Sequence, residues 1–269
     1  MKKTLMVITL THTLLLAACA PQNFQNQMKE GPSAAIVGGD RVETSSLVGR
    51  STVGIYESKI GYICSGTLIG RNLVLTAAHC VDPKAKNLAV IFSPEMRKAR
   101  RNQIRPVTQW MVHPEYSGNV QAKDMSDIAV LRFDGEAPAG FEPAPLLLDR
   151  NYLRNGQRTI VAGYGLNWTI GIHRGAGTLR TTRLPMDDVN FSETEVLLGQ
   201  SIRRGICSGD SGGPAYLEVQ GRLYVWGVAS RGDSIPLLLV PDCMLFSVFT
   251  RVSSHQVFLQ NAINTLSRN

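Results

Sequence analysis

The sequence has 269 residues, a formal net charge of +7, 18% charged residues and 25 glycines. This length suffices for one large β-domain or two small ones, and sparse charge with abundant glycine favours β-structure over helical bundles. The chain has no low-complexity tract and, apart from an apolar stretch at its N-terminus, no candidate membrane segment. These features exclude a fibrous protein and a multi-spanning helical membrane protein.

The N-terminus has the pattern of an export signal. Two lysines precede an apolar stretch over residues 5–18, which is too short for a permanent anchor. The stretch ends in Leu16-Ala17-Ala18-Cys19, typical of bacterial lipoprotein signals that are cut before a lipidated cysteine. We predict a signal peptide over 1–18 and a polar linker or pro-segment over 19–35. An ordinary signal peptide with an incidental Cys19 is the alternative.

This pattern also predicts the location of the protein. A lipid on Cys19 would anchor the precursor to a membrane, so we expect a membrane as its partner before activation. We therefore expect an exported protein, held in the periplasm or at the outer membrane as a precursor, or secreted. Four further cysteines in an exported chain predict two disulfides with three possible connectivities, among Cys64, Cys80, Cys207 and Cys243.

After residue 35, short apolar runs alternate with Gly, Pro, Asn and Asp, as in an all-β barrel or sandwich. The last segment differs, because Phe258, Ala262 and Leu266 recur every four residues, which predicts one helix capped by Ser253 or Ser254. A stretch rich in Gly, Pro and Ala over 134–145 is the candidate break between two β-units. The predicted strands span 51–56, 66–69, 73–76, 88–92, 107–112, 128–133, 159–162, 195–198, 214–218, 223–229 and 246–251.

One basic run stands out between the predicted strands. It has no acidic residue among its members, which are Arg97, Lys98, Arg100, Arg101 and Arg105. Such a run binds an acidic partner or forms a solvated loop. No aromatic residue or motif accompanies it, so we favour the solvated loop and predict no nucleic-acid partner.

The strongest chemical signal is Cys207-Ser208-Gly209-Asp210-Ser211-Gly212-Gly213-Pro214. A serine hydroxyl is a weak nucleophile that needs an adjacent base, and the oxyanion it creates needs hydrogen-bond donors. Glycines around Ser211 permit a tight turn that aims the amides of Gly209 and Ser211 at one point. A glycine-rich turn with an ordinary serine is the alternative.

Two further segments supply the partners that Ser211 needs. His79 follows an apolar strand within Thr76-Ala77-Ala78-His79-Cys80, and Asp127 begins the apolar run 127–131. A single His is more often structural than catalytic, and an Asp at the head of a strand often caps a turn. The order His79, Asp127, Ser211 favours the catalytic interpretation.

These segments together closely resemble the trypsin/chymotrypsin family of serine proteases, which has the same order of catalytic residues. The resemblance covers Ile36 to the C-terminal helix, so a peptidase domain is expected over 36–269. Secondary markers are His113-Pro114 with Tyr116, Gly163-Tyr164-Gly165, and the segment 247–252.

The resemblance implies an all-β fold of two six-stranded antiparallel β-barrels with a C-terminal α-helix and the active site between them. It implies disulfides Cys64–Cys80 and Cys207–Cys243, and a serine endopeptidase that hydrolyses a protein or peptide substrate. The triad would be His79, Asp127 and Ser211, with an oxyanion hole from the amides of Gly209 and Ser211. No cofactor is expected. No metal is expected either, because the region matching the family's calcium loop, near Glu95, is mostly basic.

Ile36-Val37-Gly38-Gly39 resembles the mature N-terminus of the family, whose freed α-amine pairs with the Asp before the nucleophile, here Asp210. We therefore expect a zymogen cut at Ala35–Ile36. This bond suggests an activating protease other than a trypsin, or self-cleavage with a small-residue preference. The cut would separate the active enzyme from a lipid on Cys19. The alternative is that Ile36 merely begins the first strand.

Carried over by position, the substrate pocket would comprise Gly205, Ile206, Ser230, Gly232 and Ser247. Trypsins have Asp where Gly205 stands, so Arg or Lys specificity is not expected, and we favour small or medium apolar side chains. The insertion over 232–243 folds over the pocket, forms an exposed apolar lip, or packs on the protein's own surface. Arg231 replaces a Trp that is usual in the family. A catalytically silent binding or adhesion protein on the same scaffold is the alternative function.

Overall fold

The structure is a computed structural model that describes residues 36–59, 61–81, 87–166, 175–201, 204–232, 243 and 245–268. The predicted signal peptide, Cys19 and the linker lie outside the described residues, as do residues 233–242 of the insertion. Neither α-helix of the described chain has the length and apolarity that crossing a bilayer requires.

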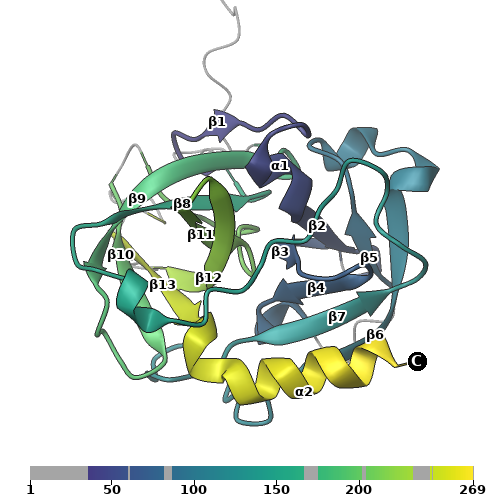
Figure 1. Cartoon of the computed structure of the whole chain (residues 1–269). Helices are drawn as coiled ribbons and strands as arrows, with labels where there is room; N and C mark the ends of the chain where they lie inside the picture. The colour runs from purple at the N-terminus through teal and green to yellow at the C-terminus, as the bar shows by residue number, and fades with distance from the viewer. Residues whose placement is uncertain are drawn as a thin grey trace, which may run out of the picture. The chain divides into compact units, whose positions relative to one another are not determined.

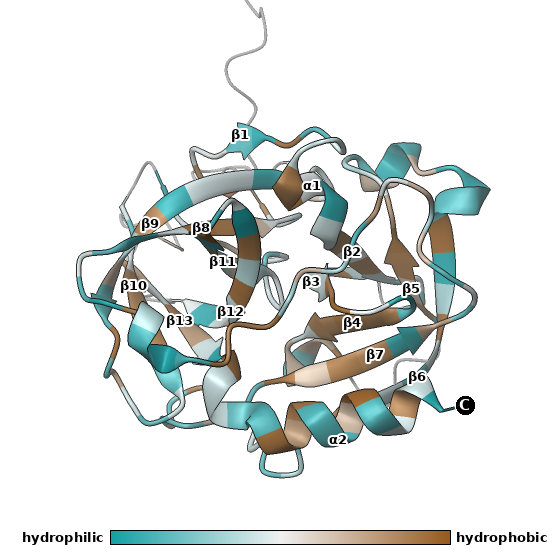
Figure 2. Ribbon diagram, viewed as in Figure 1, coloured by the Kyte–Doolittle hydropathy of each residue, from teal (hydrophilic) through white to brown (hydrophobic). Residues whose placement is uncertain are grey.

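The first half of the described chain forms a closed antiparallel barrel with the strand order β2-β3-β4-β7-β6-β5. Its apolar, β-branched runs are buried, as in β4, where all four residues are buried. In Figure 1 this barrel lies on the right, and Figure 2 shows that β4 and β7 are largely hydrophobic. The strands are β2 (Thr52–Glu57), β3 (Tyr62–Leu68), β4 (Leu73–Thr76), β5 (Leu88–Ile91), β6 (Ile104–Val112) and β7 (Ala129–Phe133).

The second half forms another six-stranded antiparallel barrel, which the additional pairing of β8 with β9 closes. The short strand β1 (Asp40–Arg41) extends this sheet by pairing with β9. The expected fold of two six-stranded barrels is therefore confirmed. The strands are β8 (Arg158–Gly163), β9 (Arg180–Asp188), β10 (Glu195–Gly199), β11 (Pro214–Val219), β12 (Arg222–Gly232) and β13 (Phe246–Arg251).

Strand β9 is absent from the sequence prediction. Polar Arg180 and Thr182 occupy buried positions in it, which hides the expected alternation of apolar and polar residues. Pro185 lies in its middle, opposite Arg158 of β8, and proline normally argues against a strand. Tertiary pairing on both sides of β9 outweighs these local signals.

Two α-helices and five 3-10 turns accompany the strands of the described chain. The C-terminal helix α2 is Gln256–Ser267 and buries Phe258, Leu259, Ala262 and Leu266. The predicted caps are wrong, because the N-cap of α2 is His255 without a side-chain cap, and Ser254 Oγ donates instead to the Glu193 carbonyl. The other elements are α1 (Leu47–Ser51), η1 (Ala78–Cys80), η2 (Met96–Lys98), η3 (Arg101–Gln103), η4 (Arg150–Tyr152) and η5 (Val252–His255).

Both disulfides expected from the resemblance are present. Cys64 of β3 is bonded to Cys80 of η1, and Cys207 is bonded to Cys243. The sequence separations of 16 and 36 residues close modest loops. By chain-entropy reasoning each bridge contributes about 3–4 kcal/mol to the free energy of unfolding.

Candidate active site

His79 and Asp127 meet because neighbouring strands of the first barrel deliver them. Strand β4 runs into η1, which carries His79, and it pairs with β7, which begins two residues after Asp127. The Nδ1 atom of His79 lies 2.8 Å from Oδ2 of Asp127, and the backbone N–H of His79 donates to Oδ1 at 3.0 Å. The carboxylate thus fixes both the imidazole ring and its backbone.

The two side chains differ in their access to solvent. The side chain of Asp127 is 1% exposed, whereas that of His79 is 31% exposed. Burial by itself raises the pKa of Asp127, but the hydrogen bonds from His79 and Ser230 and the neighbouring His79 charge outweigh it and hold the pKa below its ordinary value. Asp127 is therefore an anionic, buried acceptor, and the imidazole faces the outside with its other edge available.

Ser211 lies in a loop that needs glycine at two positions, Gly209 and Gly212. Gly209 has φ +96°, and a Cβ there would lie 2.8 Å from Cα of Gly165. Gly212 has φ +77°, and a Cβ there would collide with Thr76 Oγ1 and the Ser65 carbonyl. Within the described part of the chain, the amides of Gly209 and Ser211 donate no hydrogen bond. No described residue therefore occupies either of these two donors.

A cavity of about 110 Å³ lies beside the loop that carries Ser211. Ser211 and Ser230 both line it, and Ser230 Oγ donates to Asp127 Oδ2 at 2.6 Å. Ser230, expected only to contact substrate, therefore also holds the carboxylate. Ile206 and Gly232 line the same cavity, as expected.

Two expected pocket residues, Gly205 and Ser247, are not among those lining this cavity. A Cβ on Gly205 would lie 2.7 Å from Cδ of Gln200, so the Gln200 carboxamide occupies the space next to that glycine. Gln200 Oε1 also accepts the N–H of Ile206 at 2.6 Å. Ser247 is fully buried on β13, opposite Gly232 of β12.

Asp210 is buried without a cation among its hydrogen-bond partners in the described chain. Its carboxylate accepts only backbone N–H groups there, from Gly165 and Cys207, each at 2.8 Å. Burial raises the pKa of Asp210 to about 7, although these two hydrogen bonds act to lower it. Gly163 and Gly165 are required here, because a Cβ on either would collide with Asp210.

Ile36 is also fully buried, in the second-barrel core cluster that contains Ile206. The carbonyl of the next residue, Val37, accepts the N–H of Gly205 at 3.2 Å, five residues before Asp210. The chain is continuous through Ile36, so the predicted α-amine does not exist in this form. The structure therefore brings the Ile36 segment to the Gly205 segment without an Ile36–Asp210 ion pair.

Comparison with known proteins decides the family. The trypsin family model matches residues 36–254. The chain belongs to the trypsin family. It is 30% identical to chymotrypsin-like elastase family member 1 of Bos taurus over 246 residues, which are 86% of this chain and 90% of the relative. It is 30% identical to chymotrypsin of Phaedon cochleariae over 251 residues, 87% of this chain and 84% of the relative. Similarity of this extent makes the protein a serine endopeptidase of the trypsin/chymotrypsin type.

This trypsin-family chain departs from the usual pattern at Arg231, and the structure shows where that side chain goes. Its guanidinium binds both carboxylate oxygens of fully buried Glu195 of β10, at 2.6 and 2.9 Å. It also donates to the carbonyl of Ala122 at 3.1 Å. Arg231 thus links the second barrel to the loop before Asp127, and its charge is neutralised.

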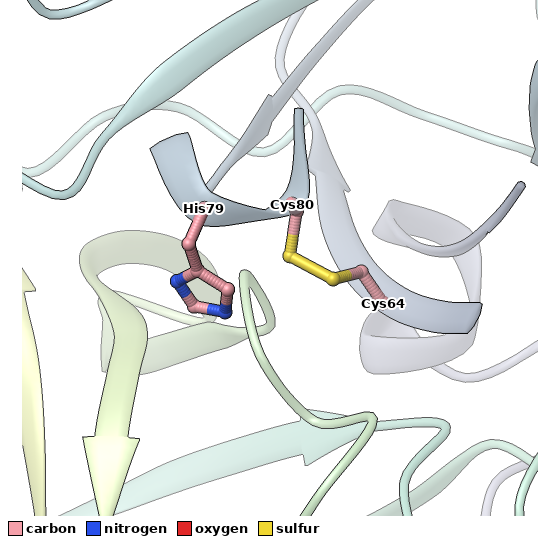
Figure 3. Close-up of side chains that lie close together, drawn as sticks. All are labelled: Cys64, His79 and Cys80. Atoms are coloured by element: carbon pink, nitrogen blue, oxygen red, sulfur yellow. A yellow bond between two sulfur atoms is a disulfide. The ribbon is translucent and has the colours of Figure 1, made fainter. Parts of the chain in front are cut away.

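One cluster of His, Cys, Asp and Glu in the described residues has metal-like spacing, namely Cys64, His79 and Cys80. Its two sulfur atoms form the disulfide, and Figure 3 shows the His79 ring beside that bridge. A disulfide sulfur is no thiolate ligand, so the cluster does not fit a metal. Glu95, where the sequence suggested no calcium site, has its carboxylate 2.8 Å from Nζ of Lys98.

Three residues that shape this trypsin-family site carry no sequence signal. Ser65 contacts the loop that carries Ser211, Gln200 fills the space beside Gly205, and Glu195 receives Arg231. Each lies in an ordinary strand or turn segment, and its partner is distant in the chain. The sequence draws attention only to Arg231, because it stands where the family usually has Trp.

Proposed function

We propose that this serine endopeptidase works through a triad in which Ser211 is the nucleophile, His79 the general base and Asp127 the residue that orients His79. The observation that carries the proposal is the 2.8 Å contact between His79 Nδ1 and Asp127 Oδ2. The cavity beside Ser211 supports this serine as the third member of the triad. Ser211 lines it together with Ser230, whose hydroxyl donates to Asp127.

The proposed reaction is hydrolysis of a peptide bond in a protein or peptide. Ser211 Oγ attacks the scissile carbonyl while His79 accepts its proton, and His79 then donates that proton to the leaving amine. The free amides of Gly209 and Ser211 bind the oxyanion of the tetrahedral intermediate. A water molecule then attacks the acyl-enzyme, and His79 accepts its proton and returns it to Ser211 Oγ as the acid product leaves. Apart from substrate and water, these steps use only groups of the protein, so the proposal needs no cofactor.

An open strand edge supports binding of an extended substrate. Strand β12 continues past its last partner in β11, and residues 231–232 pair only with β13 within the described chain. No described strand therefore pairs with this side of residues 231–232, which lie beside the cavity that Ser211 lines. We propose that the substrate main chain adds there as an antiparallel strand.

We propose a preference for small or medium apolar side chains immediately before the cleaved bond. Ile206 faces the cavity, Gly205 offers no carboxylate, and the Gln200 amide closes the space beside it. The elastase relatives are consistent with this class. A buried Arg or Lys would find no carboxylate among the described residues that line this cavity.

A matched set of fluorogenic peptides with Ala, Val, Leu, Phe or Arg before the cleaved bond tests the proposal. We expect kcat/KM to be at least about 100-fold higher for Ala or Val than for Arg, since an unpaired buried charge costs several kcal/mol. Preferred cleavage after Arg would overturn the proposed specificity. Cleavage of none of the peptides by the form beginning at Ile36 would count against the endopeptidase itself.

We propose further that the protein is a zymogen activated by cleavage of Ala35–Ile36, by another protease or by itself. A buried carboxylate without a cation is unfavourable, and a new Ile36 ammonium would pair with Asp210. The raised pKa of Asp210 in the uncleaved chain supports this, as does the buried position of Ile36.

The pH dependence of stability tests the Asp210 pairing. In the uncleaved chain the pKa of Asp210 is about 7, against an ordinary 3.8, so the folded state holds the proton to higher pH than the unfolded state. This group's contribution therefore lowers the free energy of unfolding as pH rises from about 4 to 7, by at most about 1.4 kcal/mol per pH unit. Urea unfolding of the chain carrying Ser211→Ala, which prevents self-cleavage, measures it.

The control is the same chain with Asp210→Asn, which has no proton to lose at this position and should lack this decline. A form beginning at Ile36 should also lack it, because the ammonium lowers the pKa of Asp210. Identical pH dependence for the uncleaved protein with and without the Asp210→Asn change would contradict the account of this carboxyl.

We also propose that the precursor is membrane-tethered through lipidated Cys19 and that activation releases the enzyme. The lipobox-like segment 16–19 supports the anchor, and no cysteine lies between Cys19 and Ile36 to hold a cleaved pro-segment by a disulfide. Mass spectrometry of active enzyme from cells checks this proposal. Active enzyme that still carries acyl-Cys19 would overturn it.

A further inference from the structure

A buried hydroxyl of the first barrel contacts a loop of the second barrel. This loop, residues 207–213, carries Ser211 and is here called the nucleophile loop. The hydroxyl belongs to Ser65 in β3, which is fully buried and follows Cys64 directly. We propose that Ser65 is a positioning residue that holds the oxyanion donors of Gly209 and Ser211 in their working geometry. This inference rests on the proposed function of Ser211.

Three hydrogen bonds connect Ser65 with the residues around the loop. The backbone N–H of Ser65 donates to the carbonyl of Ser211 at 2.8 Å. Its hydroxyl donates to the carbonyl of Gly209 at 2.9 Å and accepts the N–H of Tyr164 at 2.9 Å. Donor and acceptor capacity of the hydroxyl are both used.

These contacts hold the two carbonyls on either side of Asp210. Because peptide groups are planar, fixing the carbonyls of Gly209 and Ser211 fixes the planes that follow each residue. Each proposed oxyanion donor lies in a plane adjacent to one of these. The Ser211 N–H in particular lies between the two fixed planes, so its direction depends on both.

Ser65 is itself held by the elements that carry the catalytic pair. Its carbonyl accepts the hydroxyl of Thr76 at 2.9 Å, in the strand that leads to His79. Its neighbour Cys64 is bonded to Cys80, next to His79. Ser65 therefore fixes the nucleophile loop relative to the strands that place His79.

The surroundings are tight around this hydroxyl. A Cβ on Gly213 would lie 3.2 Å from Cβ of Ser65, and a Cβ on Gly212 would lie 2.5 Å from its carbonyl oxygen. Removing the hydroxyl leaves the buried Tyr164 N–H without this acceptor and the partly buried Gly209 carbonyl without this donor. The loop is then free to rotate the Gly209–Asp210 peptide to find new partners.

The experiment compares Ser65→Ala with Thr159→Val. Thr159 Oγ1 is a matched control, since it is fully buried, donates to the Tyr216 carbonyl at 2.8 Å and accepts the Trp226 indole N–H at 2.8 Å, in the core of the second barrel. The readouts are Tm, kcat and KM on the best peptide of the set above, and Ki for a peptide boronic acid. Rates are divided by the fraction of sites that a fluorophosphonate titrates.

We expect both variants to lose Tm to a similar degree. Only Ser65→Ala should lose kcat, by at least about tenfold with KM nearly unchanged, because an indirect effect on oxyanion binding is smaller than the loss of a donor itself, about 10²–10³. Boronate affinity should fall with kcat, because the bound adduct is tetrahedral.

Unchanged kcat per titrated site in Ser65→Ala, with a loss of Tm like that of Thr159→Val, would overturn the inference and leave Ser65 a structural residue. Should Ser65→Ala not fold, Ser65→Gly removes the same hydroxyl and keeps the backbone hydrogen bond to Ser211. It is judged in the same way, by kcat per titrated site together with the change in Tm. All variants are compared in the form beginning at Ile36, and failure of the wild-type protein in that form to label at all would instead overturn the proposed function, which distinguishes the two outcomes.

Discussion

Replacing Ser211 by Ala should lower kcat by about six orders of magnitude while leaving the fold intact. The proposed reaction begins with Ser211 Oγ, and the remaining site can only orient water and bind an oxyanion. Ser211 lines a cavity and is not among the buried residues, so the loss of its hydroxyl should leave the free energy of unfolding nearly unchanged. Steady-state hydrolysis of a peptide and thermal unfolding measure the two effects.

The double variant His79→Ala with Ser211→Ala is the informative companion. Residues that act as one unit have non-additive effects, so the second change should cost little beyond the first. Substantial activity in Ser211→Ala, or additive losses in the double variant, would contradict a mechanism in which His79 serves by activating Ser211.

Asp127→Asn should lower kcat by about four orders of magnitude, because an amide cannot replace this carboxylate. Oδ1 accepts the backbone N–H of His79, and Oδ2 receives the Ser230 hydroxyl and faces His79 Nδ1. An asparagine has one acceptor oxygen, so its NH₂ group would oppose one set of donors and favour the wrong imidazole tautomer. Activity at neutral pH, with KM as a check on binding, measures the effect.

Asp124→Asn is the matched control on the same loop. Its Oδ1 atom alone accepts three hydrogen bonds, one from Ser192 and two from Thr194. An asparagine can retain that oxygen, so kcat should change by less than about threefold. A loss in Asp124→Asn comparable to that in Asp127→Asn would mean that charge in this loop, rather than the orientation of His79, governs activity.

The residues that form the proposed triad were predictable because each sits in a local motif. His79, Asp127 and Ser211 lie in short segments whose order is diagnostic of one family, and apolar runs marked most strands of both barrels. Gly163 and Gly165 were visible as a marker, but their role in making room for Asp210 is a property of three-dimensional packing.

What the sequence did not reveal depends on distant partners. Ser65 and Gly209 are 144 residues apart and share a hydrogen bond, and nothing near Ser65 signals it. The Arg231–Glu195 pair shows the same limit, because an unusual residue was evident but its buried acceptor was not. The start of α2 was misjudged for a related reason, since Ser254 bonds a carbonyl of another loop instead of capping its own helix.

We infer that Ser211 is an activated nucleophile under the control of the Ile36 terminus. Fluorophosphonate labelling with the modified residue mapped by mass spectrometry tests this inference, on the full-length precursor, on the form beginning at Ile36 and on Ser211→Ala. We expect a label on Ser211 in the Ile36 form, much slower labelling of the precursor and none on the variant. Equal labelling of precursor and Ile36 form would contradict the Ile36–Asp210 switch, and no label on Ser211 in either form would contradict the catalytic account.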